Sequence, residues 1–169
     1  GFSFADLGED TRATLFCTTG TTGDPKGVCH SHRQLVLHRL AVAAGLGTVP
    51  GRGGIKRDDI DMPITPLFHA HGWGFPYVAT FPGLKPIYPG RYGPARLRSL
   101  IAGQGVTFSH CVPTILSMVL ADPHGATTDL PRWKVRIGGA ALPEGLARPA
   151  RRHGIDRHAA HGRSETCPC

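Results

Sequence analysis

Residues 13–27 read Ala13-Thr14-Leu15-Phe16-Cys17-Thr18-Thr19-Gly20-Thr21-Thr22-Gly23-Asp24-Pro25-Lys26-Gly27, and this stretch decides the fold. Its apolar start predicts a β-strand over 13–17, and the Thr and Gly residues that follow predict a loop over 18–27. Glycines let the backbone turn tightly and present its N–H groups, while Lys26 adds a compact positive charge that suits phosphate. The loop is not a Walker A loop, because Gly27 follows Lys26. On composition alone, a surface turn rich in Thr and Gly remains the alternative.

Downstream of this loop, short apolar runs alternate with helical patterns. Ser31 is placed to cap a helix that Gly45 or Gly47 ends, and Pro94 and Pro143 are placed to start two more. Pro149 is expected to kink or end the last helix early. Further strands are expected at 61–67, 85–88, 106–111, 133–137 and 156–160, and further helices at 73–81 and 114–120. The alternation predicts an α/β fold with an open, mostly parallel sheet and flanking helices.

Three loops with polar or glycine-rich sequences follow predicted strands, at 18–27, 68–73 and 161–166. Ligands of open α/β sheets bind outside the carboxyl ends of the strands, so these loops are the candidate site. His69 and His71 lie two residues apart at a strand end and are expected to face the same side. Two histidines do not make a zinc site, so metal binding by this pair is disfavoured.

Composition narrows the classes of partner. The formal net charge is +7, but the basic residues are dispersed and have no aromatic residues interleaved, so solvated surfaces are favoured over nucleic-acid binding. No apolar run approaches the length of a transmembrane segment. The five cysteines lack a disulfide framework and fit reduced thiols in the cytoplasm. The chain lacks an initiator Met and natural terminal features, so both ends are expected to be cuts.

The loop, followed by His30-Ser31-His32-Arg33, resembles the signature of the adenylate-forming superfamily of AMP-binding enzymes, which includes acyl-CoA synthetases, luciferases and peptide-synthetase adenylation domains. Four later segments continue the resemblance in the expected order: 66–73 (PLFHAHGW), 106–107 with 112–114 (VT and VPT), 138–143 (GGAALP) and 160–166 (AHGRSET). The Phe-His and Trp spacing is most similar to the medium- and long-chain fatty acyl-CoA synthetase branch. In that branch an aromatic residue at the position of Trp73 gates the acyl tunnel.

The resemblance implies a role for each matched residue. The ATP phosphates would be bound by Thr18, Thr19, Gly20, Thr21, Thr22, Gly23 and Lys26. Adenine and AMP would be bound by Gly138, Gly139, Ala140, His161, Gly162 and Ser164. The acyl pocket and its gate would comprise His69, Trp73 and Gly139. The catalytic residues would be Lys26, Ser164 and Glu165, with Glu165 holding Mg²⁺, a hard cation that prefers carboxylate oxygen.

The implied reaction is ATP-dependent activation of a fatty acid through acyl-AMP to acyl-CoA, with ATP, Mg²⁺ and coenzyme A taking part. Residues 1–169 would form part of the large domain, without the C-terminal lid domain, and the segment alone is expected to be inactive. The family allows a homodimer of the intact enzyme. His161 replaces a usual tyrosine and Arg163 an apolar residue. Alternatives are an aryl-CoA synthetase, another adenylation domain, or a nucleotide-binding module without turnover.

Overall fold

A five-stranded parallel sheet forms the centre of the molecule. The structure is a computed structural model and describes all residues except 19–22, 51–52, 122–129, 131 and 168–169. The strands are β3 (Ile60–Pro63), β4 (Lys85–Pro86), β5 (Phe108–Cys111), β6 (Lys134–Ile137) and β7 (Asp156–Ala159), in the order β4-β3-β5-β6-β7. Every neighbouring pair is parallel. The predicted α/β class and open parallel sheet are therefore confirmed.

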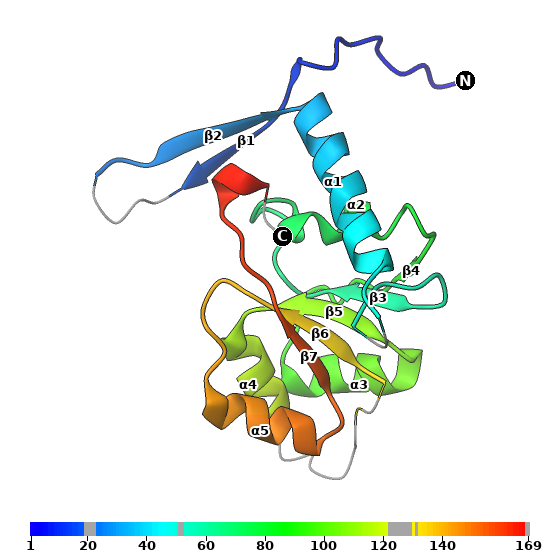
Figure 1. Cartoon of the computed structure of the whole chain (residues 1–169), viewed down its shortest axis with the longest axis vertical. Coiled ribbons are helices and arrows are strands. Elements are labelled where there is room, and N and C mark those ends of the chain that lie inside the picture. Colours follow the sequence, from blue (N-terminus) through cyan, green and yellow to red (C-terminus); the bar gives the residue numbers. More distant parts are fainter. Residues whose placement is uncertain (19–22, 51–52, 122–129, 131, 168–169) are drawn as a thin grey trace.

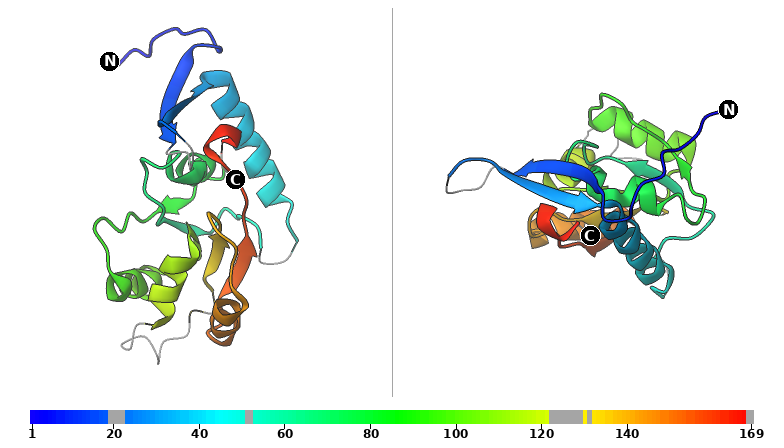
Figure 2. Two further views of the ribbon diagram at one scale, coloured as in Figure 1. Left: turned by 90° about the vertical axis from the view of Figure 1, so that its left-hand side faces the viewer. Right: turned by 90° about the horizontal axis from the view of Figure 1, so that it is seen from above.

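Helices cover both faces of this sheet (Figures 1 and 2). One face packs against α3 (Pro94–Gln104), α4 (Pro113–Ala121) and α5 (Glu144–Arg152), around a core that includes Met62, Leu97 and Val135. The other face packs against α1 (His32–Gly47) and α2 (Phe75–Val78) around Trp73 and Phe108. The described helices include none long and apolar enough to cross a lipid bilayer.

Charged side chains lie buried on the α1 and α2 face of the sheet. Lys134 Nζ lies 2.6 Å from Asp59 Oδ2, and it donates a second hydrogen bond to the carbonyl of Gly54. The hydroxyl of Thr107 donates to the other carboxylate oxygen of Asp59, at 2.7 Å. Asp61 lies two residues further along and is 1% exposed; neither of its carboxylate oxygens has a hydrogen-bond partner among the described residues. The Asp59 carboxylate is thus satisfied, whereas that of Asp61 is not.

A separate antiparallel hairpin stands above the sheet (Figure 1). It consists of β1 (Arg12–Thr18) and β2 (Lys26–Ser31), paired from Thr18 with Lys26 to Arg12 with Ser31. The first strand was predicted, but β2 was not, and β1 does not join the parallel sheet. Residues 26–31 lack the apolar alternation that marks a strand, so their extended backbone depends on pairing with β1.

The ends of several elements differ from the sequence prediction. Ser31 caps α1 as expected and forms a capping box with Gln34, and α1 ends at Gly47. The strand predicted over 61–67 ends at Pro63, and the helix predicted over 73–81 is the 3-10 turn η1 (Gly72–Gly74) followed by α2. Pro149 does not end α5, which continues to Arg152. Ala147 and Ala150 of α5 are buried against the core, so packing offsets the missing N–H of the proline.

Candidate functional site

A turn with an unusual backbone carries the predicted acyl-pocket residues. From Ala70 to Gly74 the φ angles are +47°, +56°, +60°, +56° and +75°, so five successive residues are left-handed. Three of them, Ala70, His71 and Trp73, have side chains that disfavour this region by roughly 1–2 kcal/mol each. Such strain persists only where surrounding contacts hold it, and it concentrates at functional sites.

Ring contacts hold the turn on both sides. Trp73 lies against His110 of β5 with ring centroids 5.6 Å apart, and Phe75 stacks on the same imidazole at 4.6 Å. On the opposite side, His71 contacts Phe16 of β1 at 4.8 Å and Tyr77 of α2 at 5.4 Å. Trp73 is therefore directed to the parallel sheet and His71 to the hairpin.

Two histidines around this turn, the half-buried His71 and the fully buried His110, have lowered pKa values. Burial is the main cause at His71, and the positive charges of Arg39 and His30 lower the pKa further. Complete burial lowers the pKa of His110 to about 3, although the backbone of Gly72 acts in the opposite direction. His110 is thus neutral at physiological pH and serves as a flat partner for Trp73 and Phe75.

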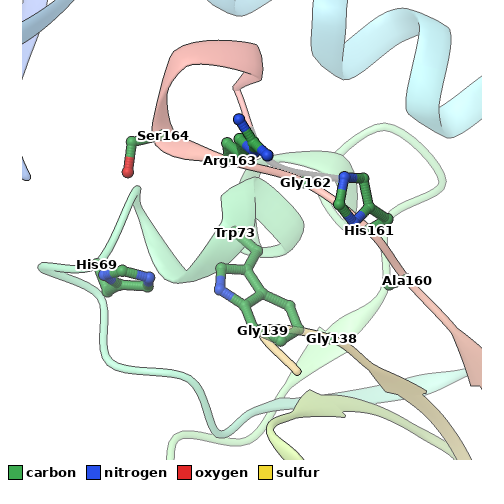
Figure 3. A pocket seen from close by; sticks show the side chains of 9 residues that line it. All are labelled: His69, Trp73, Gly138, Gly139, Ala160, His161, Gly162, Arg163 and Ser164. Carbon is green, nitrogen blue, oxygen red and sulfur yellow. The ribbon is translucent and has the colours of Figure 1, made fainter. Parts of the chain in front are cut away.

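The predicted motifs meet around a small cavity of about 50 Å³. It is lined by His69, Trp73, Gly138, Gly139, Ala160, His161, Gly162, Arg163 and Ser164. In Figure 3, His69 and Ser164 lie on one side of Trp73 and His161 lies on the other. Three segments far apart in the sequence thus converge on this cavity. Two of them fall largely within the predicted loops 68–73 and 161–166, whereas no described residue of the third predicted loop, 18–27, lines it.

Glycine is required at one point of this cavity. A Cβ on Gly138 would lie 2.9 Å from the carbonyl oxygen of Ala160 and 3.2 Å from Cη2 of Trp73. The first distance is shorter than real side chains accept, and the backbone carbonyl cannot rotate away. The bare backbone of Gly138 therefore lets the indole of Trp73 lie flat against the end of β6.

A second, larger cavity of about 490 Å³ lies beside the first. Both are lined by Gly139 and by 160–163, and Ala140 contributes only to the second. His161 and Arg163, which depart from the family pattern, are exposed and line both cavities. Three of the residues predicted to bind adenine and AMP, Gly139, His161 and Gly162, therefore line both cavities.

Of the predicted phosphate-binding residues, the three that the structure describes, Thr18, Gly23 and Lys26, do not line these cavities. Thr18 and Lys26 pair at the end of the hairpin next to its connecting loop. The Thr18 hydroxyl donates to the Lys26 carbonyl at 3.3 Å. Gly23 has a φ of +123°, which favours glycine. Thr19, Gly20, Thr21 and Thr22 lie outside the described residues.

The hairpin contacts the last motif through a histidine. Ser164 and Glu165 lie in the 3-10 turn η3 (Ser164–Thr166), and Glu165 is exposed. His30 of β2, which is 6% exposed, forms a 2.8 Å hydrogen bond from Nε2 to the carbonyl of Ser164. The start of α1 is capped by Ser31 together with Gln34 and not by His30.

Two more features of the site differ from expectation. His69 lines the small cavity, whereas His71 lines a different one beside α1 and α2, so the two do not face the same side as predicted. The left-handed turn is the reason, since alternation of side chains applies only to an extended strand. The sequence analysis also missed His110, an imidazole in the fully buried strand β5, where Ser109 is polar as well.

Comparison with known proteins gives the family. Residues 3–169 match the family model described as "AMP-binding enzyme". The chain is 42% identical over 154 residues to a long-chain-fatty-acid–CoA ligase of Thermus thermophilus, covering 89% of this chain and 27% of that protein. It is 40% identical over 172 residues to a 3-methylmercaptopropionyl-CoA ligase of Ruegeria pomeroyi, covering 99% of this chain and 31% of that protein.

Solved structures agree with this family. The N-terminal domain of FACL13 from Mycobacterium tuberculosis superposes with a TM-score of 0.80 at 27% identity, over 98% of this chain and 40% of that chain. O-succinylbenzoate coenzyme A synthetase from Bacillus subtilis, in complex with ATP and magnesium ion, gives 0.77 at 26% identity, over 95% of this chain and 32% of that chain. The present chain thus spans less than half the length of the proteins it matches, and it belongs to the family of AMP-binding enzymes.

Proposed function

We propose that the full-length protein containing this chain activates a carboxylic acid with ATP and transfers the acyl group to coenzyme A. In this proposal residues 1–169 are part of the large domain. The observation that carries it is the convergence of the 69–73 turn, the glycine turn at 138–139 and the 160–164 segment on one cavity. The relatives named as CoA ligases support the reaction class.

The proposed chemistry needs no covalent enzyme nucleophile. An oxygen of the substrate carboxylate attacks the α-phosphorus of ATP, and the bond to pyrophosphate breaks to give acyl-AMP. The thiol of coenzyme A then attacks the acyl carbon, loses its proton, and AMP departs. The protein must hold two anions together and offset their repulsion, which is the work of N–H groups, cations and hydroxyls.

We assign these tasks to the residues described above. Lys26 and the hairpin loop would bind the β- and γ-phosphates, and the Ser164 hydroxyl would donate to the α-phosphate. The larger cavity beside Ala140 and His161 has room for adenine, while His69 and Trp73 would contact the acid. Gly139 would serve both groups, because it lines both cavities.

Glu165 fits the divalent cation that such a reaction requires. Its carboxylate is exposed in η3, a turn whose backbone is bonded to β2 through His30. Mg²⁺ is usually held by one or two carboxylates together with substrate phosphates, so one free carboxylate near the phosphate loop is a suitable donor. When bound, the ion would neutralise charge on the phosphate oxygens.

Within this class we propose a fatty acid as substrate, because the indole of Trp73 lines the cavity and the long-chain-fatty-acid–CoA ligase of Thermus thermophilus is a relative. The relative named for 3-methylmercaptopropionyl-CoA suggests a shorter acid as the second candidate. The described cysteines are free thiols, which supports a cytoplasmic enzyme. These assignments of substrate and location are proposed for the full-length protein.

The test uses purified full-length protein with ATP, Mg²⁺, coenzyme A and a panel of straight-chain, short thioether and aromatic acids. Mass spectrometry of acyl-CoA and an assay for pyrophosphate are the measurements. We expect acyl-CoA from straight-chain acids, with AMP and pyrophosphate as the other products. Turnover of aromatic acids alone would overturn the fatty-acid proposal, and absence of both acyl-AMP and acyl-CoA would overturn the reaction class.

A further inference from the structure

The bond between His30 and Ser164 connects two motifs separated by most of the chain. A backbone carbonyl can only accept, so the 2.8 Å contact requires a proton on Nε2 of His30. The imidazole is 6% exposed, and the centroid of Phe16 lies 6.1 Å from it, which packs the ring on the hairpin side. A buried hydrogen bond with this geometry is costly to lose because the carbonyl would be left unsatisfied.

The location of His30 gives this bond its importance. His30 lies on β2, the strand that begins with Lys26, and its partner residue across the ladder is Thr14. The Thr14 hydroxyl in turn lies 3.2 Å from Nε2 of His71, at the base of the left-handed turn. One end of the hairpin therefore carries the phosphate loop, and the other end contacts two of the three segments that form the cavity, the turn at 69–73 and the 160–164 segment.

We propose that His30 is a positioning residue that sets the distance between the phosphate loop and the Ser164–Glu165 turn; the inference rests on the proposed function. The hairpin does not belong to the parallel sheet, so sheet hydrogen bonds do not fix its position relative to β7 and η3. During adenylation one ATP molecule must contact both sides at once. A displacement of about 1 Å at such a point can cost about a hundredfold in rate.

Two variants of the full-length enzyme separate this role from general stability. His30→Phe keeps an aromatic ring beside Phe16 but removes the donor. His30→Gln places an amide N–H at a similar distance from the backbone and restores a donor. His32→Phe is the matched control, since His32 is an exposed histidine two residues further along.

The two half-reactions are measured separately. Acyl-AMP formation is followed by pyrophosphate exchange, and thioester formation is followed by adding synthetic acyl-AMP and coenzyme A. Only the first needs the phosphate loop aligned with the Ser164–Glu165 turn. We expect His30→Phe to lower the kcat of the first about tenfold to a hundredfold, with the KM for the acid unchanged, and to leave the second at the wild-type rate.

The outcomes are distinguishable. Recovery of most of the first rate in His30→Gln, with His32→Phe equal to wild type, would support the positioning role. Equal loss of both half-reactions in His30→Phe, or no loss in either, would overturn it, as would failure of His30→Gln to recover activity. A wild-type enzyme that forms no acyl-AMP would instead overturn the proposed function, which is a different result.

Discussion

Asp61 makes the stability of the fold depend on pH in an unusual direction. Its side chain is 1% exposed, and burial, followed by the charge of Asp59, raises its pKa from 3.8 to about 7. The folded chain therefore keeps the proton up to about pH 7, whereas the unfolded chain releases it near 3.8. The contribution to stability is greatest below pH 3.8 and is lost as the pH rises to about 7.

The magnitude follows from the two pKa values. At 1.36 kcal/mol for each pH unit, the gap between 3.8 and about 7 corresponds to a loss of about 4 kcal/mol on ionisation. Asp61→Asn keeps the shape of the side chain but cannot ionise. We therefore expect the variant to gain stability relative to wild type as the pH is raised from about 5 to 8.

Thermal unfolding of the full-length protein at a series of pH values measures this effect. The quantity of interest is how the difference in Tm between Asp61→Asn and wild type changes with pH. The cost of burying the amide is the same at every pH, so it does not affect this change. We expect the difference to increase by a few degrees between pH 5 and pH 8. The control is Asp58→Asn, which changes an exposed carboxylate of the same segment. Parallel Tm profiles for Asp61→Asn and wild type would refute the reasoning.

Three further predictions concern the site. Lys26→Ala should lower the rate of adenylation about a hundredfold while changing the Kd for the acid little, because the charge acts on phosphate; single-turnover kinetics and acid binding measured without ATP test this, and an unchanged rate would exclude the phosphate role. Gly138→Ala should destabilise the protein by roughly 1–3 kcal/mol, seen as a lower Tm, because its Cβ meets the Ala160 carbonyl; an unchanged Tm would show that β6 can shift. Trp73→Ala should enlarge the 50 Å³ cavity and raise kcat/KM for longer or branched acids relative to wild type; the same acid preference in both would show that Trp73 does not limit the pocket.

The sequence predicted the α/β class and the parallel sheet because strand patterns and helical patterns alternate along the chain. Those patterns depend on local composition, so they can be recognised without knowing which strands and helices pack together in the fold. Strand β2 was missed for the opposite reason, since residues 26–31 are extended only because they pair with β1. The continuation of α5 past Pro149 likewise depends on burial of Ala147 and Ala150, which no local pattern reveals.

The sequence predicted which residues would lie together around the cavity but not their geometry, and their roles in binding stay predictions. Motif resemblance led to His69, Trp73, Gly138 and Ser164, and the structure brings these four around one cavity. Motif resemblance could not show that His30 forms a hydrogen bond to the backbone of Ser164, because every residue has a main-chain carbonyl and the sequence does not indicate which one is used. The opposed directions of His69 and His71 were also hidden, since they arise from five left-handed residues in succession.

The left-handed backbone at Trp73 bears on how the acyl pocket could be redesigned. With φ at +56°, this position disfavours any side chain and suits glycine. Replacing the indole by hydrogen would empty the pocket and relax the main chain in one step, so part of the packing energy lost would be regained. Replacement of a large buried side chain by glycine is usually the most damaging change in a protein interior. At residue 73 it should be better tolerated than replacement by a side chain of intermediate size, which makes this residue a favourable starting point for engineering acceptance of bulky acids.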